Sequence, residues 1–206
     1  MKKLQRIHKE WFARDAVTLA QELLGKVIIY KGVGGMIVET EAYAKDPASH
    51  AFRRTPRSEI MYSTHGVFYI YFTYGMHHCL NITTDKDDVG AVLIRALEPL
   101  EGVENMARRR GIKLPRQSVY PERSRRASGQ RQSAMQSISS GPGKLCSALG
   151  ITRKLNGTLV NEKIEVREYK KIAKKDIVAT TRIGISQAKD LPWRFYIKGN
   201  PWVSRL

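Results

Sequence analysis

The stretch that decides the fold reads Met36-Ile-Val-Glu39-Thr-Glu41-Ala-Tyr43-Ala-Lys-Asp46-Pro-Ala-Ser-His50-Ala-Phe52. Its apolar start predicts a short buried strand, and its polar, proline-containing continuation predicts a loop. The strand therefore delivers Glu41, Tyr43 and His50 onto one loop, where a carboxylate, a phenol and an imidazole meet. Polar side chains at the point where a strand gives way to a loop are typical of a functional site.

The segments on either side predict a sheet with helices packed against it. Residues 11–24 carry apolar side chains at helical spacing and are followed by Gly25, which predicts an amphipathic helix that ends there. Strand-forming runs separated by turn residues cover residues 27–30, 36–38, 67–74, 79–82, 91–97, 158–169, 177–185 and 194–198. The predicted fold class is α+β, a single domain with a mixed, mostly antiparallel, curved sheet and flanking helices.

Further helices are predicted in the second half of the chain. Residues 99–106 predict a helix that begins at a proline, and residues 140–150 predict a short one that ends at a glycine. Residues 108–154, which include the second of these helices, contain a single acidic residue, Glu122, among many arginines, serines and glutamines. Such a composition buries little apolar surface, so residues 113–137 are predicted to form a mobile basic loop.

Composition indicates one domain, residues 1–206, that binds a polyanion. The hydrophobic content of 42% is enough for one well-buried core. Lys and Arg number 36 against 19 Asp and Glu, and the net charge of +17 favours contact with phosphates or with an anionic membrane surface. The sequence has no apolar run of about 18 residues and no apolar segment after its basic start, so we expect neither a membrane span nor a secretory signal.

The cysteines and histidines do not predict a metal site. Cys79 and Cys146 lie far apart and lack the paired spacing of zinc or iron–sulfur ligands. His77 and His78 adjoin Cys79, but neighbours along a strand point to opposite faces. We expect no metal, no other cofactor, and two reduced, packed thiols.

Glu39 and Glu41 share a face if the strand continues through them. The pair is open to two interpretations: two carboxylates that divide the acid and base roles, or a structural Glu39 beside a reactive Glu41. We favour the second, and a surface carboxylate is the simplest alternative for Glu41. Arg95 lies in an otherwise apolar strand and needs an anion, which is either Glu39 or Glu98 in a salt bridge or a ligand in a site.

Aromatic residues gather on one predicted strand. Tyr69 and Tyr71 share a face, and each phenol needs a hydrogen-bond partner if it is buried, so this face is either half exposed or part of a site. Tyr74 precedes Gly75, and a bulky ring at a glycine-supported bend projects outward as a wedge. Asn81, flanked by apolar residues, either satisfies backbone groups or contacts the edge of a ligand.

Several segments in fixed order closely resemble the alkyladenine (3-methyladenine, methylpurine) DNA glycosylase family. They are Val38-Glu-Thr-Glu-Ala-Tyr43, Asp46-Pro-Ala-Ser-His50, Thr55-Pro-Arg57, Tyr69-Ile-Tyr-Phe-Thr-Tyr-Gly-Met76, Cys79-Leu-Asn81, Ile94-Arg-Ala-Leu-Glu-Pro-Leu-Glu-Gly102, Ser140-Gly-Pro-Gly-Lys-Leu-Cys146 and Arg194-Phe-Tyr-Ile-Lys-Gly-Asn-Pro-Trp-Val-Ser204. The likeness spans most of the chain and is weakest over residues 113–137. It implies a monofunctional, metal-independent hydrolase that flips alkylated or deaminated purines out of duplex DNA, cleaves the N-glycosidic bond and leaves an abasic site for base excision repair.

The resemblance also implies roles for individual residues inside the site. Glu41 corresponds to the carboxylate that orients and activates the attacking water, and Arg95 to the arginine that helps to hold this water. The extruded base would lie between aromatic walls, which correspond to Tyr43, His50 and Tyr71. Asn81 corresponds to the position that would clash with the exocyclic amine of guanine.

Other residues are expected to contact the duplex itself. By resemblance, Tyr74 enters the minor groove and fills the vacated stack, and Met76 and His77 follow it on the same protrusion. The family often has a tyrosine where His77 stands, which predicts an altered intercalation. Among the many basic residues, Arg57 and Lys144 are expected to neutralise phosphates.

The expected partner is therefore damaged double-stranded DNA, bound by a monomer with no membrane association. The expected location is the cytoplasm of a bacterium, on its nucleoid, or the nucleus in a eukaryote. Two alternatives remain open. A non-catalytic, basic nucleic-acid-binding module explains the charge and the wedge but not a carboxylate among aromatic rings. A glycosidase or nuclease with another substrate is the second, although a nuclease usually needs a carboxylate cluster for metal ions.

Overall fold

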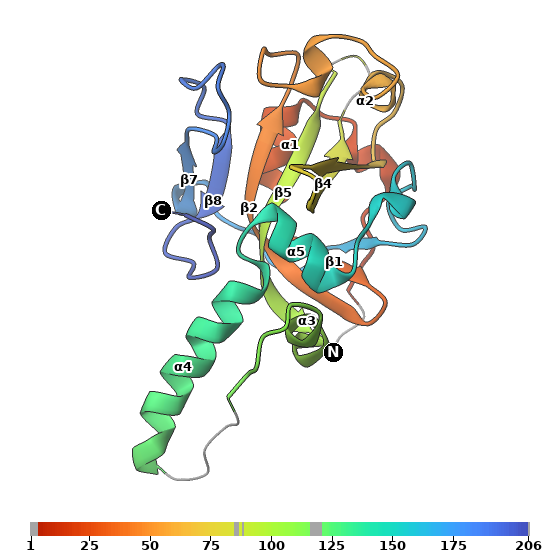
Figure 1. Cartoon of the computed structure of the whole chain (residues 1–206). Helices are drawn as coiled ribbons and strands as arrows, with labels where there is room; N and C mark the ends of the chain where they lie inside the picture. Colours follow the sequence, from red (N-terminus) through yellow and green to blue (C-terminus); the bar gives the residue numbers. More distant parts are fainter. Residues whose placement is uncertain (1–3, 85–86, 88, 116–120, 206) are drawn as a thin grey trace.

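The computed structural model describes residues 4–84, 87, 89–115 and 121–205, which are organised around one curved sheet (Figure 1). Its strands are β1 (Val27–Tyr30), β2 (Val33–Tyr43), β3 (Phe68–Thr73), β4 (His77–Thr83), β5 (Ala91–Glu101), β6 (Glu165–Arg167), β7 (Ile177–Thr180) and β8 (Arg194–Ile197). The order across the sheet is β3-β4-β5-β2-β1-β6, and β8 pairs with both β2 and β7. All pairings between these strands are antiparallel.

Strand β2 is the centre of the sheet. One of its edges pairs with β5 along almost its whole length, and the other pairs first with β1 and then with β8. Register shifts between Ile37 and Thr40 mark a β-bulge, which bends the strand and re-aims its side chains. Beyond the bulge, Thr40 Oγ1 donates to the carbonyl of Ala20 on the core side. Glu39 and Glu41 therefore point to the opposite face.

Helices and short 3₁₀ turns pack around the sheet. They are α1 (Ala16–Glu22), α2 (Glu59–Ser63), α3 (Val103–Arg109), α4 (Pro121–Ser139), α5 (Pro142–Leu149), η1 (Lys9–Phe12), η2 (His50–Phe52), η3 (Arg153–Leu155) and η4 (Lys174–Asp176). Helix α1 packs against β2 and β5, helix α5 packs against β4 and β5, and α4 extends away from the sheet (Figure 1). The main core includes Phe12, Leu19, Ile28, Ile37, Phe68, Leu80, Ile94, Met106, Leu145 and Leu149.

The predicted fold class, a single α+β domain with a curved sheet, is confirmed, but several element boundaries differ. The helix predicted over residues 11–24 is divided into η1 and α1, because Asp15 caps the second helix by accepting a hydrogen bond from Thr18 N. The strand predicted over residues 36–38 is much longer. Glu41 consequently lies inside β2 and not at the point where a strand ends. The last three predicted strands are shortened to β6, β7 and β8.

Two predictions for the middle of the chain were wrong. Pro99 lies inside β5 opposite Gly35, next to a register shift that tolerates a residue without a donor, and α3 begins only after Gly102.

The segment predicted as a basic loop contains helix α4, because a helix pairs its own backbone groups without burying apolar side chains along its length. Ile138 and Ser139 anchor its end in the core. Residues 116–120 of that segment lie outside the described residues.

Candidate active site

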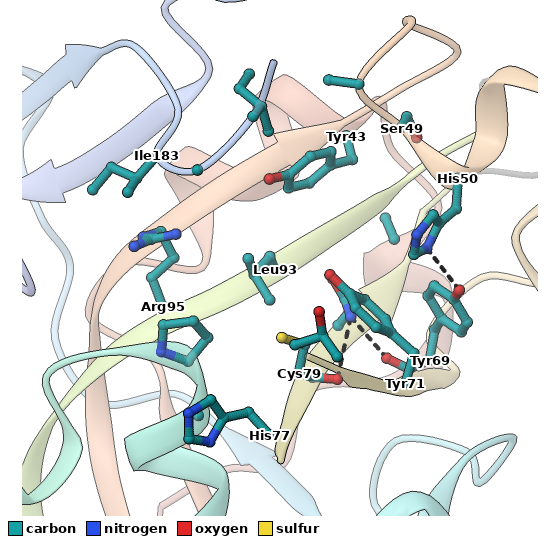
Figure 2. Close-up of a pocket in the computed structure, with 18 of the residues that line it drawn as sticks. Tyr43, Ser49, His50, Tyr69, Tyr71, His77, Cys79, Leu93, Arg95 and Ile183 are labelled. Atoms are coloured by element: carbon teal, nitrogen blue, oxygen red, sulfur yellow. Dashed lines mark hydrogen bonds between the residues drawn. The ribbon is translucent and has the colours of Figure 1, made fainter. Parts of the chain in front are cut away.

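A cavity of about 340 Å³ lies between the β3–β4 hairpin, the ends of β2 and β5, and the segment that follows β7, a volume typical of small-ligand sites. It is lined by Tyr43, Ala48, Ser49, His50, Met61, Tyr69, Tyr71, Thr73, Tyr74, His77, Cys79, Asn81, Ala91, Leu93, Arg95, Pro142, Gly143, Ile183, Gly184 and Ile185. Figure 2 shows Tyr43, Arg95 and Ile183 around one end of the cavity and His50, Tyr69 and Tyr71 around the other. Segments far apart in the sequence therefore form one pocket.

Three aromatic rings form one wall of the pocket. The rings of His50 and Tyr71 meet edge to face with centroids 4.8 Å apart, and the centroids of Tyr69 and Tyr71 are 5.5 Å apart. Tyr69 is buried, and its hydroxyl lies 2.9 Å from His50 Nδ1. Burial and the nearby Arg57 guanidinium lower the pKa of His50, which keeps the ring neutral at pH 7. The tyrosine face therefore lines the pocket.

Glu41 lies directly behind the opposite wall. Its carboxylate is completely buried and does not itself line the cavity, but each group that contacts it does. Tyr43 Oη donates to Glu41 Oε2 over 2.9 Å, and the Arg95 Nη1 atom lies 3.2 Å from the same oxygen. The backbone N–H of Ile183 donates to Glu41 Oε1 over 2.7 Å. Two side chains and one backbone amide thus hold the carboxylate at the edge of the pocket.

The surroundings of this carboxylate shift its pKa upwards. Burial raises the pKa of Glu41 above its ordinary value of 4.5, and the charge of Arg95 and the hydrogen bonds offset only part of this effect. Burial and the adjacent Glu41 carboxylate also raise the pKa of Tyr43, so its phenol keeps its proton and donates. A carboxylate with a raised pKa beside a cavity is a recognised mark of a functional site.

Arg95 forms one of the salt bridges left open by the sequence, and it also lines the cavity. Its Nε donates to Glu39 Oε1 over 3.0 Å, so it forms a structural salt bridge, and its Nη1 end also reaches Glu41 at the cavity. Glu98 is not its partner and instead accepts a hydrogen bond from Asn200. Glu39 also accepts a hydrogen bond from Arg194 over 2.7 Å, which makes it the structural carboxylate of the pair.

Asn81 lines the pocket in a fixed orientation. Its Nδ2 donates to the Tyr69 carbonyl over 2.9 Å and more weakly to the Cys79 carbonyl over 3.4 Å. The side chain is buried and held by its own strand and the neighbouring one, so it cannot turn aside for a larger ligand. Cys79 is also buried, and burial raises the pKa of its thiol, which keeps it protonated.

The tip of the β3–β4 hairpin carries the expected wedge at the rim of the pocket. Tyr74 is 80% exposed with φ of 50°, a conformation that non-glycine residues rarely adopt, and Gly75 follows with φ of 65°. Met76 is 67% exposed beside it. His77 differs from both, because β4 begins there and its ring lies so close to Gly143 of α5 that a Cβ on this glycine would stand 2.9 Å from it.

The two basic residues singled out from the sequence also lie near the pocket. Arg57 is exposed, and its guanidinium carbon lies 5.1 Å from the centroid of the Tyr71 ring. Lys144 is exposed in the first turn of α5, directly after two residues that line the cavity.

The structure adds a supporting residue that the sequence analysis missed. Arg182 is buried, donates to Asp46 through two nitrogens at 2.7 and 3.1 Å, and donates to the Ala42 carbonyl over 3.0 Å. Its guanidinium carbon lies 4.8 Å from the centroid of Tyr43 and 5.2 Å from that of Trp193. It thereby fixes a pocket ring and the segment that presents Ile183. Its ion-pair partner Asp46 lies 136 positions away, and no local pattern marks Arg182.

A ring-lined pocket with a buried carboxylate behind one wall, in a strongly basic chain, is the arrangement expected of a DNA glycosylase. Residues 10–201 match the family model described as methylpurine-DNA glycosylase. The chain belongs to this family, and it is therefore a DNA repair enzyme that hydrolyses N-glycosyl bonds.

Similar proteins cover nearly the whole chain. One from Clostridium perfringens (strain 13 / Type A) is 45% identical over 97% of this chain and 99% of its own length. One from Carboxydothermus hydrogenoformans is 42% identical over 96% and 97%, and one from Methanoculleus marisnigri is 41% identical over 95% and 96%. Each is described provisionally as a 3-methyladenine DNA glycosylase.

None of the helices within residues 4–84, 87, 89–115 and 121–205 is long and apolar enough to cross a membrane. Within the same residues, no group of three or more His, Cys, Asp and Glu side chains is placed to hold a metal ion.

Proposed function

We propose that the enzyme flips alkylated or deaminated purines out of duplex DNA into this pocket and hydrolyses the bond between base and sugar, which leaves an abasic site. The observation that carries the proposal is the position of Glu41, a buried carboxylate held by three groups that all line an aromatic cavity. A protein that only binds nucleic acid has no use for such a carboxylate, because a buried charge costs free energy of folding.

The exposed tip of the β3–β4 hairpin is suited to support base flipping. A base inside a duplex is inaccessible, and turning it out costs about a few kcal/mol of stacking and pairing. Tyr74 stands at the rim of the pocket with most of its ring exposed, so it can enter the stack as the base leaves it. Base–aromatic stacking contributes about 1–3 kcal/mol per base, which offsets the cost of extrusion.

The rings inside the pocket favour damaged bases. A purine alkylated on a ring nitrogen carries positive charge, and the faces of Tyr43 and Tyr71 attract a cation by about 0.5–2 kcal/mol more than a neutral base. Asn81 acts in the opposite direction on guanine, because its side chain, held by the Tyr69 carbonyl, would clash with the exocyclic amine. Attraction and exclusion together select the substrate.

Glu41 supplies the chemistry. A carboxylate accepts about four hydrogen bonds, and the described residues provide three donors, so Glu41 has capacity for a water molecule that enters from the cavity. Arg95 holds that water from the other side. As the base departs, the sugar gains oxocarbenium character, which the negative charge of Glu41 stabilises while the carboxylate takes a proton from the water.

A direct assay tests the proposal. The protein is incubated with a duplex that contains one hypoxanthine and with methylated duplex DNA, with and without EDTA, and abasic sites and released purines are measured. Release of the damaged purine from each duplex, with EDTA as well as without it, supports the proposal. Damaged-duplex binding without any release would overturn it in favour of a non-catalytic binding protein.

One substitution assigns the chemistry to Glu41. Glu41→Gln keeps the shape of the side chain but removes the base, and we expect damaged-duplex affinity to be retained while the rate of base release falls by about 100-fold or more. Glu98→Gln, a carboxamide substitution in β5 away from the cavity, is the matched control and should retain the wild-type rate. Full activity of Glu41→Gln would remove Glu41 from the mechanism.

A further inference from the structure

We propose that Glu39 and Ser204 of the C-terminal segment are positioning residues that fix the Arg95 guanidinium in the orientation needed beside Glu41. The proposal rests on the proposed function of Glu41 and Arg95. Neither Glu39 nor Ser204 lines the cavity, so each acts through Arg95 and not by contact with the substrate.

Glu39 is the centre of a buried network. Its Oε1 accepts hydrogen bonds from Arg95 Nε over 3.0 Å, from Arg194 Nε over 2.7 Å and from Ser204 Oγ over 2.9 Å, and its Oε2 accepts one from Ser204 N over 2.6 Å. Three donors meet at Oε1 and the fourth at Oε2, so the carboxylate is held by groups from three separate segments. The Glu39 side chain is completely buried, so these bonds persist without competition from solvent.

This network determines how Arg95 meets Glu41. A free guanidinium prefers to grip a carboxylate with two parallel hydrogen bonds. Here Glu39 holds Nε of Arg95 and Ser204 Oγ lies 3.4 Å from Nη2, which leaves Nη1 to meet Glu41 over 3.2 Å. A bidentate pair between Arg95 and Glu41 would engage both oxygens of Glu41 and leave no place for water. Glu39 therefore keeps Arg95 close enough to orient a water molecule and prevents it from covering the base.

The charges of the cluster also balance. Glu39 and Glu41 carry two negative charges, and Arg95 and Arg194 carry two positive charges, all in a buried region. Glu39 adds a second negative charge close to Glu41, on the other side of Arg95. Without Glu39, the positive charges of Arg95 and Arg194 would favour ionised Glu41 more strongly and make it a weaker base.

The C-terminal segment closes the network from outside. Ser204 contributes its backbone N–H and its hydroxyl to Glu39, its hydroxyl lies 3.4 Å from Arg95 Nη2, and Arg194 Nη2 donates to the carbonyl of Arg205. Ser204 is 165 positions from Glu39 and partly exposed, so substitutions there disturb the network with little effect on the core. The last residues of the chain thus support the catalytic centre.

The test uses a graded series at Ser204 in the full chain. Ser204→Thr keeps both donors, Ser204→Ala keeps only the N–H, and Ser204→Pro removes both. With a hypoxanthine-containing duplex, we expect the single-turnover rate of base release to be unchanged in the first, reduced in the second and reduced by roughly tenfold or more in the third, because small misplacements of catalytic groups have large effects on rate. Val203→Ala, in the same segment, is the control and should retain the wild-type rate.

Two further readouts separate positioning from general damage to the fold. Damaged-duplex affinity should stay within roughly threefold of wild type in every Ser204 variant, because the pocket wall is untouched. Glu39→Gln, which lets Arg95 turn fully towards Glu41, should lower the rate and move the acidic limb of the pH–rate profile to lower pH. If Glu39→Gln fails to fold, the Ser204 series decides alone.

The possible failures are distinguishable. Absence of base release from the wild-type protein contradicts the proposed function itself. An active wild type and an inactive Glu41→Gln, together with wild-type rates and pH profiles throughout the Ser204 series, would overturn the positioning role and leave the proposed function intact.

Discussion

The backbone N–H of Ile183 donates a hydrogen bond to Glu41 Oε1 over 2.7 Å and joins two segments that are 142 positions apart in the chain. One segment is the central strand of the sheet, and the other is the connection between β7 and β8, which lines the cavity. The carboxylate is therefore held from the outer edge of the sheet as well as from within it. Its buried environment, and not its chemical type, raises its pKa above the ordinary value.

The pH dependence of base release follows from this environment. Burial raises the pKa of Glu41 above 4.5, and water activation needs the ionised carboxylate. We expect the single-turnover rate at saturating enzyme to fall as the pH falls through this raised pKa, with an acidic limb above pH 4.5. A profile whose acidic limb lies at or below that value would contradict a buried Glu41 as the base.

The rate of base release should rise with pH, whereas the stability that the Glu41 proton contributes should fall as the pH rises. A raised folded-state pKa means that the folded protein binds the proton of Glu41 more tightly than the unfolded chain does. The stability from this proton is complete below pH 4.5 and is lost as the pH rises through the folded pKa. Glu41→Gln lacks this loss, so its free energy of unfolding relative to wild type should increase from acidic to neutral pH. Urea unfolding of both proteins at several pH values measures the difference, and a constant difference would contradict the prediction.

The sequence predicts the strands well where apolar and β-branched residues form continuous runs, as in β3, β4 and β5. It fails in β2, because Glu39 and Glu41 interrupt the apolar pattern and look like the start of a loop. Both carboxylates are tolerated inside the sheet only because Arg95 and Arg194 lie against them. Such long-range charge pairing leaves no local signal, so the strand end was placed too early.

The site residues also divide into those that a local pattern marks and those that only long-range contacts define. Local pattern and resemblance pointed to Glu41, Tyr43, His50, Tyr71, Asn81 and Arg95, and the structure brings them together in or directly behind one pocket. Arg182 and Ile183 were missed for physical reasons. Arg182 pairs with Asp46, which is 136 positions away, and Ile183 acts through a backbone amide that every residue except proline possesses.

Tyr74 offers a test of the proposed wedge. Tyr74→Ala should weaken binding of a hypoxanthine-containing duplex by about 1–3 kcal/mol, because the ring that fills the vacated stack is lost, and Tyr74→Phe should preserve most of the affinity. Tyr169→Ala is a matched control, since this tyrosine is also exposed, at 48%, but does not line the pocket. Fluorescence anisotropy gives the affinities. Equal losses in Tyr74→Ala and Tyr169→Ala would argue against intercalation.

Arg182 should matter for both stability and rate. Its guanidinium makes two bonds to Asp46 and lies against Tyr43 and Trp193, and a lysine reproduces neither the fork nor the flat contact. We expect Arg182→Lys to lower the free energy of unfolding by about 3 kcal/mol, because Asp46 remains buried with a poorer partner.

Arg54→Lys is the control for this substitution, because Arg54 makes a comparable two-nitrogen pair with Glu59 on the exposed surface and should lose far less stability. The variant at position 182 should also release bases more slowly under stabilising conditions, since Tyr43 and the Ile183 amide lose their common support. Chemical denaturation and single-turnover assays on both variants check the two effects. If Arg182→Lys matched Arg54→Lys in both, the buried guanidinium would have no part in shaping the pocket.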